Sequence, residues 1–308
     1  MSLPVSVQIK KINEFSGHNG AIYGLVCDPN NNVFYSVAGD GWIVRWPISA
    51  TECDGTLIGD SSTKLFCIAF GEASQLLVAG DINGFLYWID PVENKILSKS
   101  SYHKGSIFDL CFISATKLVS VSADGYVCLW DTQSRLPVIS FRISFQGLRC
   151  IKHDKLEKKL YIGASDNHIY ILDDDTFDVI NIIKNAHGSS VFSIENLTSE
   201  LWVSGGRDAL LKFWDKKDKM LKESISAHWY TINKIIALPE ISAFATASRD
   251  KSLRIWDTAT FELLKNVDLQ KGGHLHSVNT LLWIPESHYL ISAGDDRTIK
   301  LFSISHLG

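Results

Sequence analysis

Tryptophan recurs at a fixed interval along this chain. Five of its nine tryptophans lie 42 residues apart, or a multiple of 42: Trp46, Trp88, Trp130, Trp214 and Trp256. A fixed period of this size indicates a repeat architecture, in which one supersecondary unit recurs and each copy packs against its neighbours. This spacing constrains the fold more strongly than the overall composition does.

The interval defines seven units. Leu172 occupies the one position of the grid that lacks tryptophan, and a last copy ends at Phe302 after a step of 46 residues. In the best-preserved units an aspartate precedes the tryptophan by six residues, as Asp124, Asp208 and Asp250 do. Since aspartate is a common turn residue, each unit is expected to contain the same tight turn before the same strand.

A histidine forms a second landmark, about 28 residues before each tryptophan. Its copies are His18, His103, His187, His228 and His274. In units two and four this slot falls at Ser61 and Ser144. Unit four therefore lacks both the histidine and the tryptophan, and it is the most degenerate copy.

Each unit reads as strands and turns. Short runs of β-branched and aromatic residues alternate with Gly, Asp, Asn and Ser, and no useful helical periodicity occurs. Four strands fit into one period, and a four-stranded unit repeated seven times is typical of a β-propeller. The predicted fold is all-β: a seven-bladed propeller of four-stranded antiparallel blades, forming a single domain over residues 1–308.

The landmarks resemble those of the WD-repeat β-propeller family. The Gly-His or Ala-His openings, the aspartate six residues before tryptophan, and the Trp-Asp pairs beginning at Trp130, Trp214 and Trp256 carry this resemblance. It extends over nearly the whole chain, and five copies in register make it specific.

The two chain ends are expected to close the ring together. The last unit reaches its third strand at residues 298–303 and the chain stops at Gly308, which leaves no room for a fourth strand. Residues 5–12 alternate apolar Val5, Val7 and Ile9 with polar neighbours. The N-terminal strand is therefore predicted to complete blade seven, so that no gap remains between blades.

Each good unit contains a histidine, a serine or threonine and an aspartate, which could be mistaken for a hydrolase triad. Because the set recurs with the period of the fold, a structural role is favoured, and the family resemblance implies that these side chains and the tryptophan hydrogen-bond in series. The predicted complete sets are His18, Ser36, Asp40 and Trp46; His103, Ser120, Asp124 and Trp130; His187, Ser204, Asp208 and Trp214; and His228, Thr246, Asp250 and Trp256. Blade seven keeps His274, Ser292 and Asp296 but ends in Phe302.

Partner binding is expected on one rim of the ring. In the family that this chain resembles, partners often dock on the face bearing the turn before the tryptophan strand, where the residues five positions after the histidine slot and just before the turn aspartate surround the channel. The candidates from these positions are Tyr23, Phe66, Phe108, Arg149, Phe192, Asn233, Arg207 and Arg249. Trp42 and Trp229 fall in or beside turns of the same face and are added to them. Asp81 and Asp295 are the only acids expected on this rim.

Aromatic and arginine residues are frequent interaction hot spots. The sequence therefore predicts a non-enzymatic interaction scaffold that binds a protein or peptide on the rim, and we hypothesise that the bound segment is acidic or phosphorylated. Two alternatives stay open at this point: the aromatics could plug the channel, and the arginines could pair with neighbouring acids.

Other functions have less support. An enzyme built on the propeller would need a non-repeating cluster of acids, histidines or cysteines, and none is found; His274 and His276 lack the partners of a metal site. No cofactor or metal is expected. The net charge of −4 argues against nucleic-acid binding. Residues 1–15 lack a signal-peptide core, no apolar run of about 18 residues occurs, and the six cysteines form no CxxC pair. A cytoplasmic protein with no membrane segment is predicted, either a monomer or a subunit of a complex.

Overall fold

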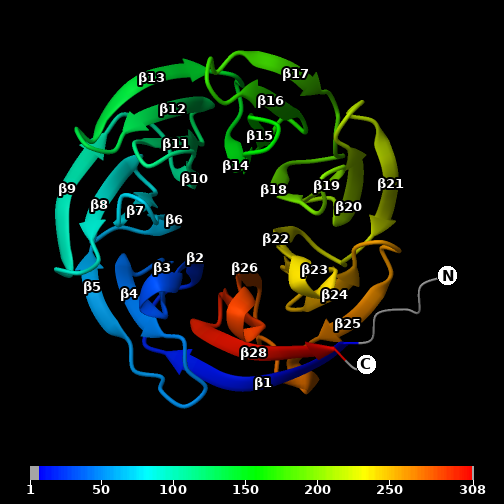
Figure 1. Cartoon of the computed structure of the whole chain (residues 1–308). Coiled ribbons are helices and arrows are strands. Elements are labelled where there is room, and N and C mark those ends of the chain that lie inside the picture. Colours follow the sequence, from blue (N-terminus) through cyan, green and yellow to red (C-terminus); the bar gives the residue numbers. More distant parts are fainter. Residues whose placement is uncertain (1–6, 307–308) are drawn as a thin grey trace.

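The chain folds into a ring of seven sheets around a central axis (Figure 1). The computed structural model describes residues 7–306. Each sheet is antiparallel and has four strands, with strand order running from the axis outward. The predicted seven-bladed β-propeller is confirmed.

The first three blades follow one another in chain order from the innermost strand to the outermost. Blade one comprises β2 (Ile22–Asp28), β3 (Val33–Ala38), β4 (Trp42–Pro47) and β5 (Thr56–Asp60). Blade two comprises β6 (Leu65–Gly71), β7 (Leu76–Asp81), β8 (Phe85–Asp90) and β9 (Lys95–Ser101). Blade three comprises β10 (Ile107–Phe112), β11 (Lys117–Ser122), β12 (Tyr126–Asp131) and β13 (Leu136–Arg142).

The next three blades repeat the same order. Blade four comprises β14 (Leu148–Asp154), β15 (Lys159–Ala164), β16 (Ile169–Asp173) and β17 (Val179–Ile183). Blade five comprises β18 (Val191–Asn196), β19 (Leu201–Gly206), β20 (Leu210–Asp215) and β21 (Leu221–Ser226). Blade six comprises β22 (Ile232–Leu238), β23 (Ala243–Ser248), β24 (Leu253–Asp257) and β25 (Leu263–Val267). Short 3-10 turns are η1 (Pro29–Asn31), η2 (Pro239–Ile241), η3 (Leu269–Lys271) and η4 (Pro285–Ser287).

Blade seven joins the two ends of the chain. It comprises β26 (Val278–Ile284), β27 (Tyr289–Gly294), β28 (Thr298–His306) and, as its outer strand, β1 (Val7–Ser16). The predicted closure by the N-terminal strand is confirmed, although Val5 lies outside the described residues. The strand runs four residues beyond the predicted end at Ile12, because a bulge between Lys11 and Asn13 absorbs the break in alternation and lets Phe15 become fully buried.

The hydrophobic core lies between neighbouring blades rather than inside one of them. Trp88 of blade two and Trp130 of blade three, for example, belong to one buried cluster, and their ring centroids are 6.4 Å apart. Trp202 in β19 and Trp283 in β26 are also buried. Because both faces of every blade are covered in this way, each unit depends on its neighbours for stability.

The strand directions define two faces of the ring. The upper face carries the start of each innermost strand and the turn between the second and third strands; the lower face carries the opposite strand ends. All six cysteines are free, and Cys53 is exposed whereas Cys67, Cys128 and Cys150 are buried. Within residues 7–306 no helix is long and apolar enough to cross a membrane.

Candidate partner-binding face

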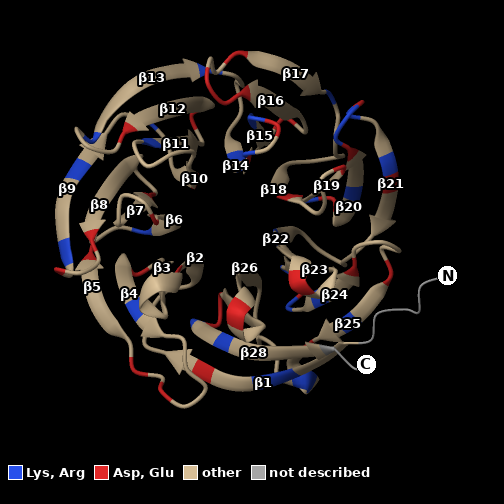
Figure 2. Cartoon of the chain, viewed as in Figure 1, with Lys and Arg blue, Asp and Glu red and all other residues tan. Residues whose placement is uncertain are grey.

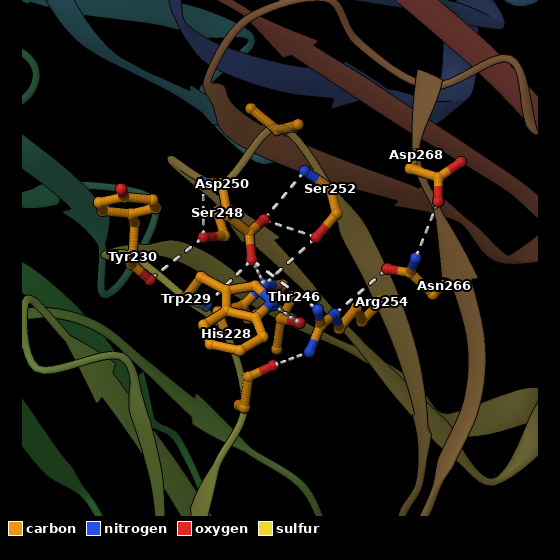
Figure 3. A network of polar contacts seen from close by, with 12 residues as sticks. His228, Trp229, Tyr230, Thr246, Ser248, Asp250, Ser252, Arg254, Asn266 and Asp268 are labelled. Atoms are coloured by element: carbon orange, nitrogen blue, oxygen red, sulfur yellow. Dashed lines mark hydrogen bonds and ion pairs between the residues drawn. The ribbon is translucent and has the colours of Figure 1, made fainter. Parts of the chain in front are cut away.

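Hydrogen-bonded side chains hold the upper turns of blades one, three, five and six. In blade six, His228 Nδ1 lies 2.9 Å from an oxygen of Asp250, and its Nε2 lies 2.7 Å from Thr246 Oγ1 (Figure 3). The indole N–H of Trp256 donates to the same threonine oxygen at 2.9 Å. The corresponding bonds occur in the other three predicted sets, and blade seven has all of them except the one from tryptophan.

The turn aspartates are held in their ionised form. Burial raises the pKa of Asp124, but hydrogen bonds from His103 and from the backbone N–H of Lys104 outweigh burial and lower this pKa to about 2. Asp250 likewise accepts backbone N–H groups from Trp229 and Ser252, and its pKa is lowered. Each aspartate thus fixes the start of one innermost strand against one turn, which gives the upper face a rigid frame.

Tyrosines replace the missing histidines in blades two and four. In blade four, the hydroxyls of Tyr170 and Ser144 contact Asp166 at 2.7 and 2.5 Å. In blade two, the Tyr87 hydroxyl lies 3.1 Å from Asp81, which also accepts two backbone N–H groups of its turn. The expectation that Asp81 is a rim acid was wrong, because this fully buried side chain ends β7 and binds the backbone of the turn that follows.

A β-bulge occurs at the same position of every innermost strand. In β10, Ile107 pairs with Ser122 and Asp109 with Val121, so that Phe108 is skipped by the ladder. The residues skipped in the seven blades are Tyr23, Phe66, Phe108, Arg149, Phe192, Asn233 and Asn279. A bulge re-aims the side chain of the extra residue, and here it turns all seven toward the axis.

These seven side chains surround the upper mouth of the channel. All of them line one cavity of about 270 Å³ on the axis, and all are half-buried. The aromatic side chains therefore line the channel mouth without filling it completely. Asp109 and Lys234 lie one residue beyond the skipped position and also line the cavity.

The aromatic residues form a continuous arc that contacts two cations, Lys64 and Arg149. The Tyr23 and Phe66 ring centroids lie 5.1 Å apart, and those of Phe66 and Phe108 lie 5.5 Å apart. The guanidinium carbon of Arg149 lies 4.4 Å from the Phe108 ring centroid and 5.5 Å from that of Phe192. Arg149 is thus held between two phenyl rings, and its Nε donates to Ser165 Oγ at 2.6 Å.

Among residues 7–306, Arg149, Arg207 and Arg249 make no ion pair within 4.0 Å. Arg207 and Arg249 are exposed at the turns of blades five and six. Burial, and then the nearby positive charge of Arg207, lower the pKa of Arg149. Arg149 therefore lines the cavity, while Arg207 and Arg249 are exposed at the upper turns of the next two blades, and local ion pairing does not account for the three cations.

The two candidate tryptophans lie in different surroundings. Trp229 is 83% exposed on the upper face, beside the 60% exposed Tyr230. Trp42 instead packs, half-buried, against the cluster that contains Phe15 and Trp46 between blades seven and one. The structure does not bring Trp42 to the channel mouth, because its side chain lies with that of Trp46 on the face of β4 that packs toward blade seven.

Asp109 and Lys234 were missed by the sequence reasoning. Regular alternation would turn the residue after Phe108 or Asn233 away from the axis, but the bulge lets two consecutive residues face the channel. Asp109 accepts N–H groups from Leu110 and Ile151; burial raises the pKa of this carboxyl, and the charge of Lys234 partly offsets that effect. No feature of a single sequence repeat marks such a bulge.

Comparison with known proteins identifies the class of this propeller. The family model "WD domain, G-beta repeat" matches residues 9–46, 94–131, 221–257 and 267–303. The chain belongs to the WD-repeat β-propeller family, as its histidine, aspartate and tryptophan landmarks predicted.

Several relatives and one solved structure are similar to this chain. A striatin homolog of Dictyostelium discoideum is 26% identical over 65% of this chain, mouse striatin is 22% identical over 96%, and protein tipD of Dictyostelium discoideum is 22% identical over 94%. The chain spans 26%, 36% and 48% of the lengths of these relatives. The crystal structure of the WD40 propeller domain of Doa1 superimposes with a TM-score of 0.85 at 18% identity, covering 96% of this chain and 97% of that one.

Proposed function

We propose that this WD-repeat propeller is a non-enzymatic protein-interaction scaffold that binds an acidic or phosphorylated segment of a partner across the upper mouth of its channel. The observation that carries this proposal is the group formed by Arg149, Arg207 and Arg249. Arg149 lines the cavity, Arg207 and Arg249 are exposed at the upper turns of the next two blades, and none of the three makes an ion pair among the described residues.

The arrangement favours an anion that arrives from outside. Arg149 is already oriented by Phe108, Phe192 and Ser165, so that little side-chain entropy remains to be lost when it binds. Arg207 is close enough to lower the pKa of Arg149, and a bound anion would relieve this repulsion between like charges. Arginine binds carboxylates and phosphates with paired N–H donors, and such charge-assisted bonds are stronger than neutral ones.

The opposite side of the mouth suits an apolar side chain. Tyr23, Phe66 and Phe108 line the cavity with ring edges and faces, and a volume of about 270 Å³ accommodates one large side chain of a peptide. The exposed Trp229 and Tyr230 extend the apolar surface on the blade-six side of the upper face. An anionic residue with an apolar neighbour is therefore the expected recognition element.

The proposal is tested with three immobilised peptide libraries that share a degenerate sequence and differ at the centre, which is phosphoserine, glutamate or serine. Wild-type protein is expected to be retained on an anionic library and not on the serine library. Retention on phosphoserine alone identifies a phosphate reader, whereas retention on both indicates acidic segments in general. Equal retention on all three would overturn the proposal.

A charge-reversed variant shows where the peptide binds. Arg207→Glu combined with Arg249→Glu is expected to lower retention at least about tenfold while the melting temperature stays nearly unchanged, because both side chains are exposed. Lys155→Glu with Lys217→Glu is the matched control: it changes the net charge equally, but both lysines are exposed in lower-face connections, after β14 and after β20. If both double variants lost retention alike, only the net charge would matter, and the upper face would not be the site.

A further inference from the structure

A second interaction surface lies on the circumference of the ring, away from the channel. β17 is the outer strand of blade four, and within residues 7–306 its only strand partner is β16. Its apolar side chains face solvent: Val179 is 41%, Ile180 51% and Ile182 38% exposed. An exposed apolar edge strand is a template for pairing with another chain, and proteins usually protect such edges with charges or proline.

β17 is the one outer strand that lacks this protection. Protective residues of the other six are Lys10, Lys11 and Glu14 in β1; Asp60 in β5; Lys95 and Lys99 in β9; Pro137 and Arg142 in β13; Lys222 and Glu223 in β21; and Lys265 in β25. β17 contains no charged residue and is tan along its length in Figure 2, whereas β9 and β21 carry blue bands of Lys or Arg. All seven outer strands have a register irregularity in their ladder, so a bulge does not distinguish β17.

The residues that flank β17 are complementary in charge. Asp178 directly precedes the strand and Lys184 directly follows it. Both side chains are exposed, and neither makes an ion pair or a side-chain hydrogen bond to another residue between 7 and 306. Both charges are therefore available to a group on another molecule.

The segment from Asp178 to Lys184 is complementary to itself when reversed. Antiparallel pairing of two copies about Asn181 places each Asp178 opposite the other copy's Lys184. It also places Val179 opposite Ile183 and Ile180 opposite Ile182, while Asn181 faces its own counterpart, whose amide can both donate and accept. This is the isologous symmetry of a two-fold dimer, in which every contact occurs twice.

We infer that β17 mediates self-association, with a second copy of this chain pairing antiparallel to it across a two-fold axis at Asn181. The interface would extend the sheet of blade four into the corresponding sheet of the second copy. β13 is the outer strand of blade three and lies next to β17 along the circumference of the ring (Figure 1). Its side chains Leu136, Val138 and Ile139 are exposed. This surface is independent of the channel mouth, so a dimer could present two upper faces to partners.

Paired charge reversals test this geometry. Asp178→Lys puts two lysines opposite each other at both ends of the interface, and Lys184→Asp does the same with two aspartates. Sedimentation velocity over the micromolar range is expected to show a reversible monomer–dimer equilibrium for the wild type, and at least about tenfold weaker association for each variant alone. When the two variants are mixed, one copy of each is expected to associate as tightly as two wild-type copies do, because both lysine–aspartate pairs are then restored.

Glu223→Lys on β21 is the matched control, since it reverses one exposed charge on the outer strand of the next blade. It is expected to leave association unchanged, and melting curves verify that every variant is folded. A wild-type protein that stays monomeric throughout would overturn the inference. So would single variants that associate like the wild type, or a mixture of the two that stays monomeric.

Discussion

The guanidinium of Arg149 stacks on the ring of Phe108, with 4.4 Å between the guanidinium carbon and the ring centroid. Both residues are skipped by the strand ladders of their blades, which is why side chains from adjacent blades meet at the axis. The contact holds a cation at the mouth of the cavity, and this cation makes no ion pair within 4.0 Å among the described residues. The first prediction concerns this cation.

Substituting Arg149→Leu is expected to reduce retention on the anionic peptide libraries strongly while changing the free energy of unfolding by less than about 1 kcal/mol. A cation–π contact of roughly 0.5–1 kcal/mol is lost, but the cost of burying a charge is also removed. Arg142 is the matched control, since its guanidinium carbon also lies 4.4 Å from a phenyl ring, that of Phe145, but outside the cavity. Equal loss of retention in Arg142→Leu would contradict a specific role for Arg149.

Acid is expected to destabilise the fold in two stages. Burial lowers the pKa of His18 and of His228, although the paired aspartates partly oppose this, so the unfolded chain binds more protons at these groups than the native chain does. Stability should therefore decrease as the pH falls below the unfolded value of about 6.5. The turn aspartates that contact a histidine have lowered pKa values in the fold and add a second loss below about pH 4, which for Asp124 continues toward pH 2. Urea midpoints at pH 7.5, 6, 5, 4 and 3 measure both stages, and midpoints that do not change from pH 7.5 to 5 would contradict the first.

Tyr170 is expected to contribute to stability as a histidine does in the regular blades. Tyr170→Phe removes a hydrogen bond to the Asp166 carboxylate and should lower the free energy of unfolding by about 1.5 kcal/mol. Tyr126→Phe in blade three is the control, because the Tyr126 hydroxyl makes no hydrogen bond to residues 7–306. Chemical denaturation of both variants gives the comparison, and equal midpoints would show that the tyrosine does not replace the histidine.

Removal of β1 is expected to open the ring. Deleting residues 1–16 exposes the edge of β28 and removes the buried side chains of Val7 and Phe15, each worth roughly 1.5–3 kcal/mol. The truncated protein should melt well below the full chain, and a synthetic peptide of residues 7–16 should restore part of the difference by pairing with β28. A truncated protein that melts like the full chain would contradict this closure.

Much of the hydrogen-bonded frame of the upper face was predictable, because its side chains recur at a fixed spacing. His187, Ser204, Asp208 and Trp214 recur in other blades at the same spacing, since each polar group needs the next as its partner when buried. The rim position of Phe108 and Arg149 was implied by the family resemblance, which places the residue five positions after the histidine slot at the channel. These features recur in most copies of the repeat, and one sequence with several copies is sufficient to reveal them.

The remaining features depend on exceptions to the period. Asp109 faces the channel because a bulge changes the alternation, and a bulge leaves no mark in a run such as β10. Tyr170 lies in an apolar run and resembles a core residue, although its hydroxyl holds a turn. Trp42 and Trp229 both lie near upper turns, and only their position relative to the strand decides that one is half-buried and the other exposed.

The central claim is that an anionic segment binds at the arginine side of the channel mouth. It is tested most directly by the retention of wild-type protein and of the Arg207→Glu, Arg249→Glu double variant on the phosphoserine and glutamate libraries. The expected result is at least about tenfold weaker retention of the double variant with an unchanged melting temperature, while the Lys155→Glu, Lys217→Glu control binds like the wild type. Equal retention of the wild type and the arginine variant would contradict the claim.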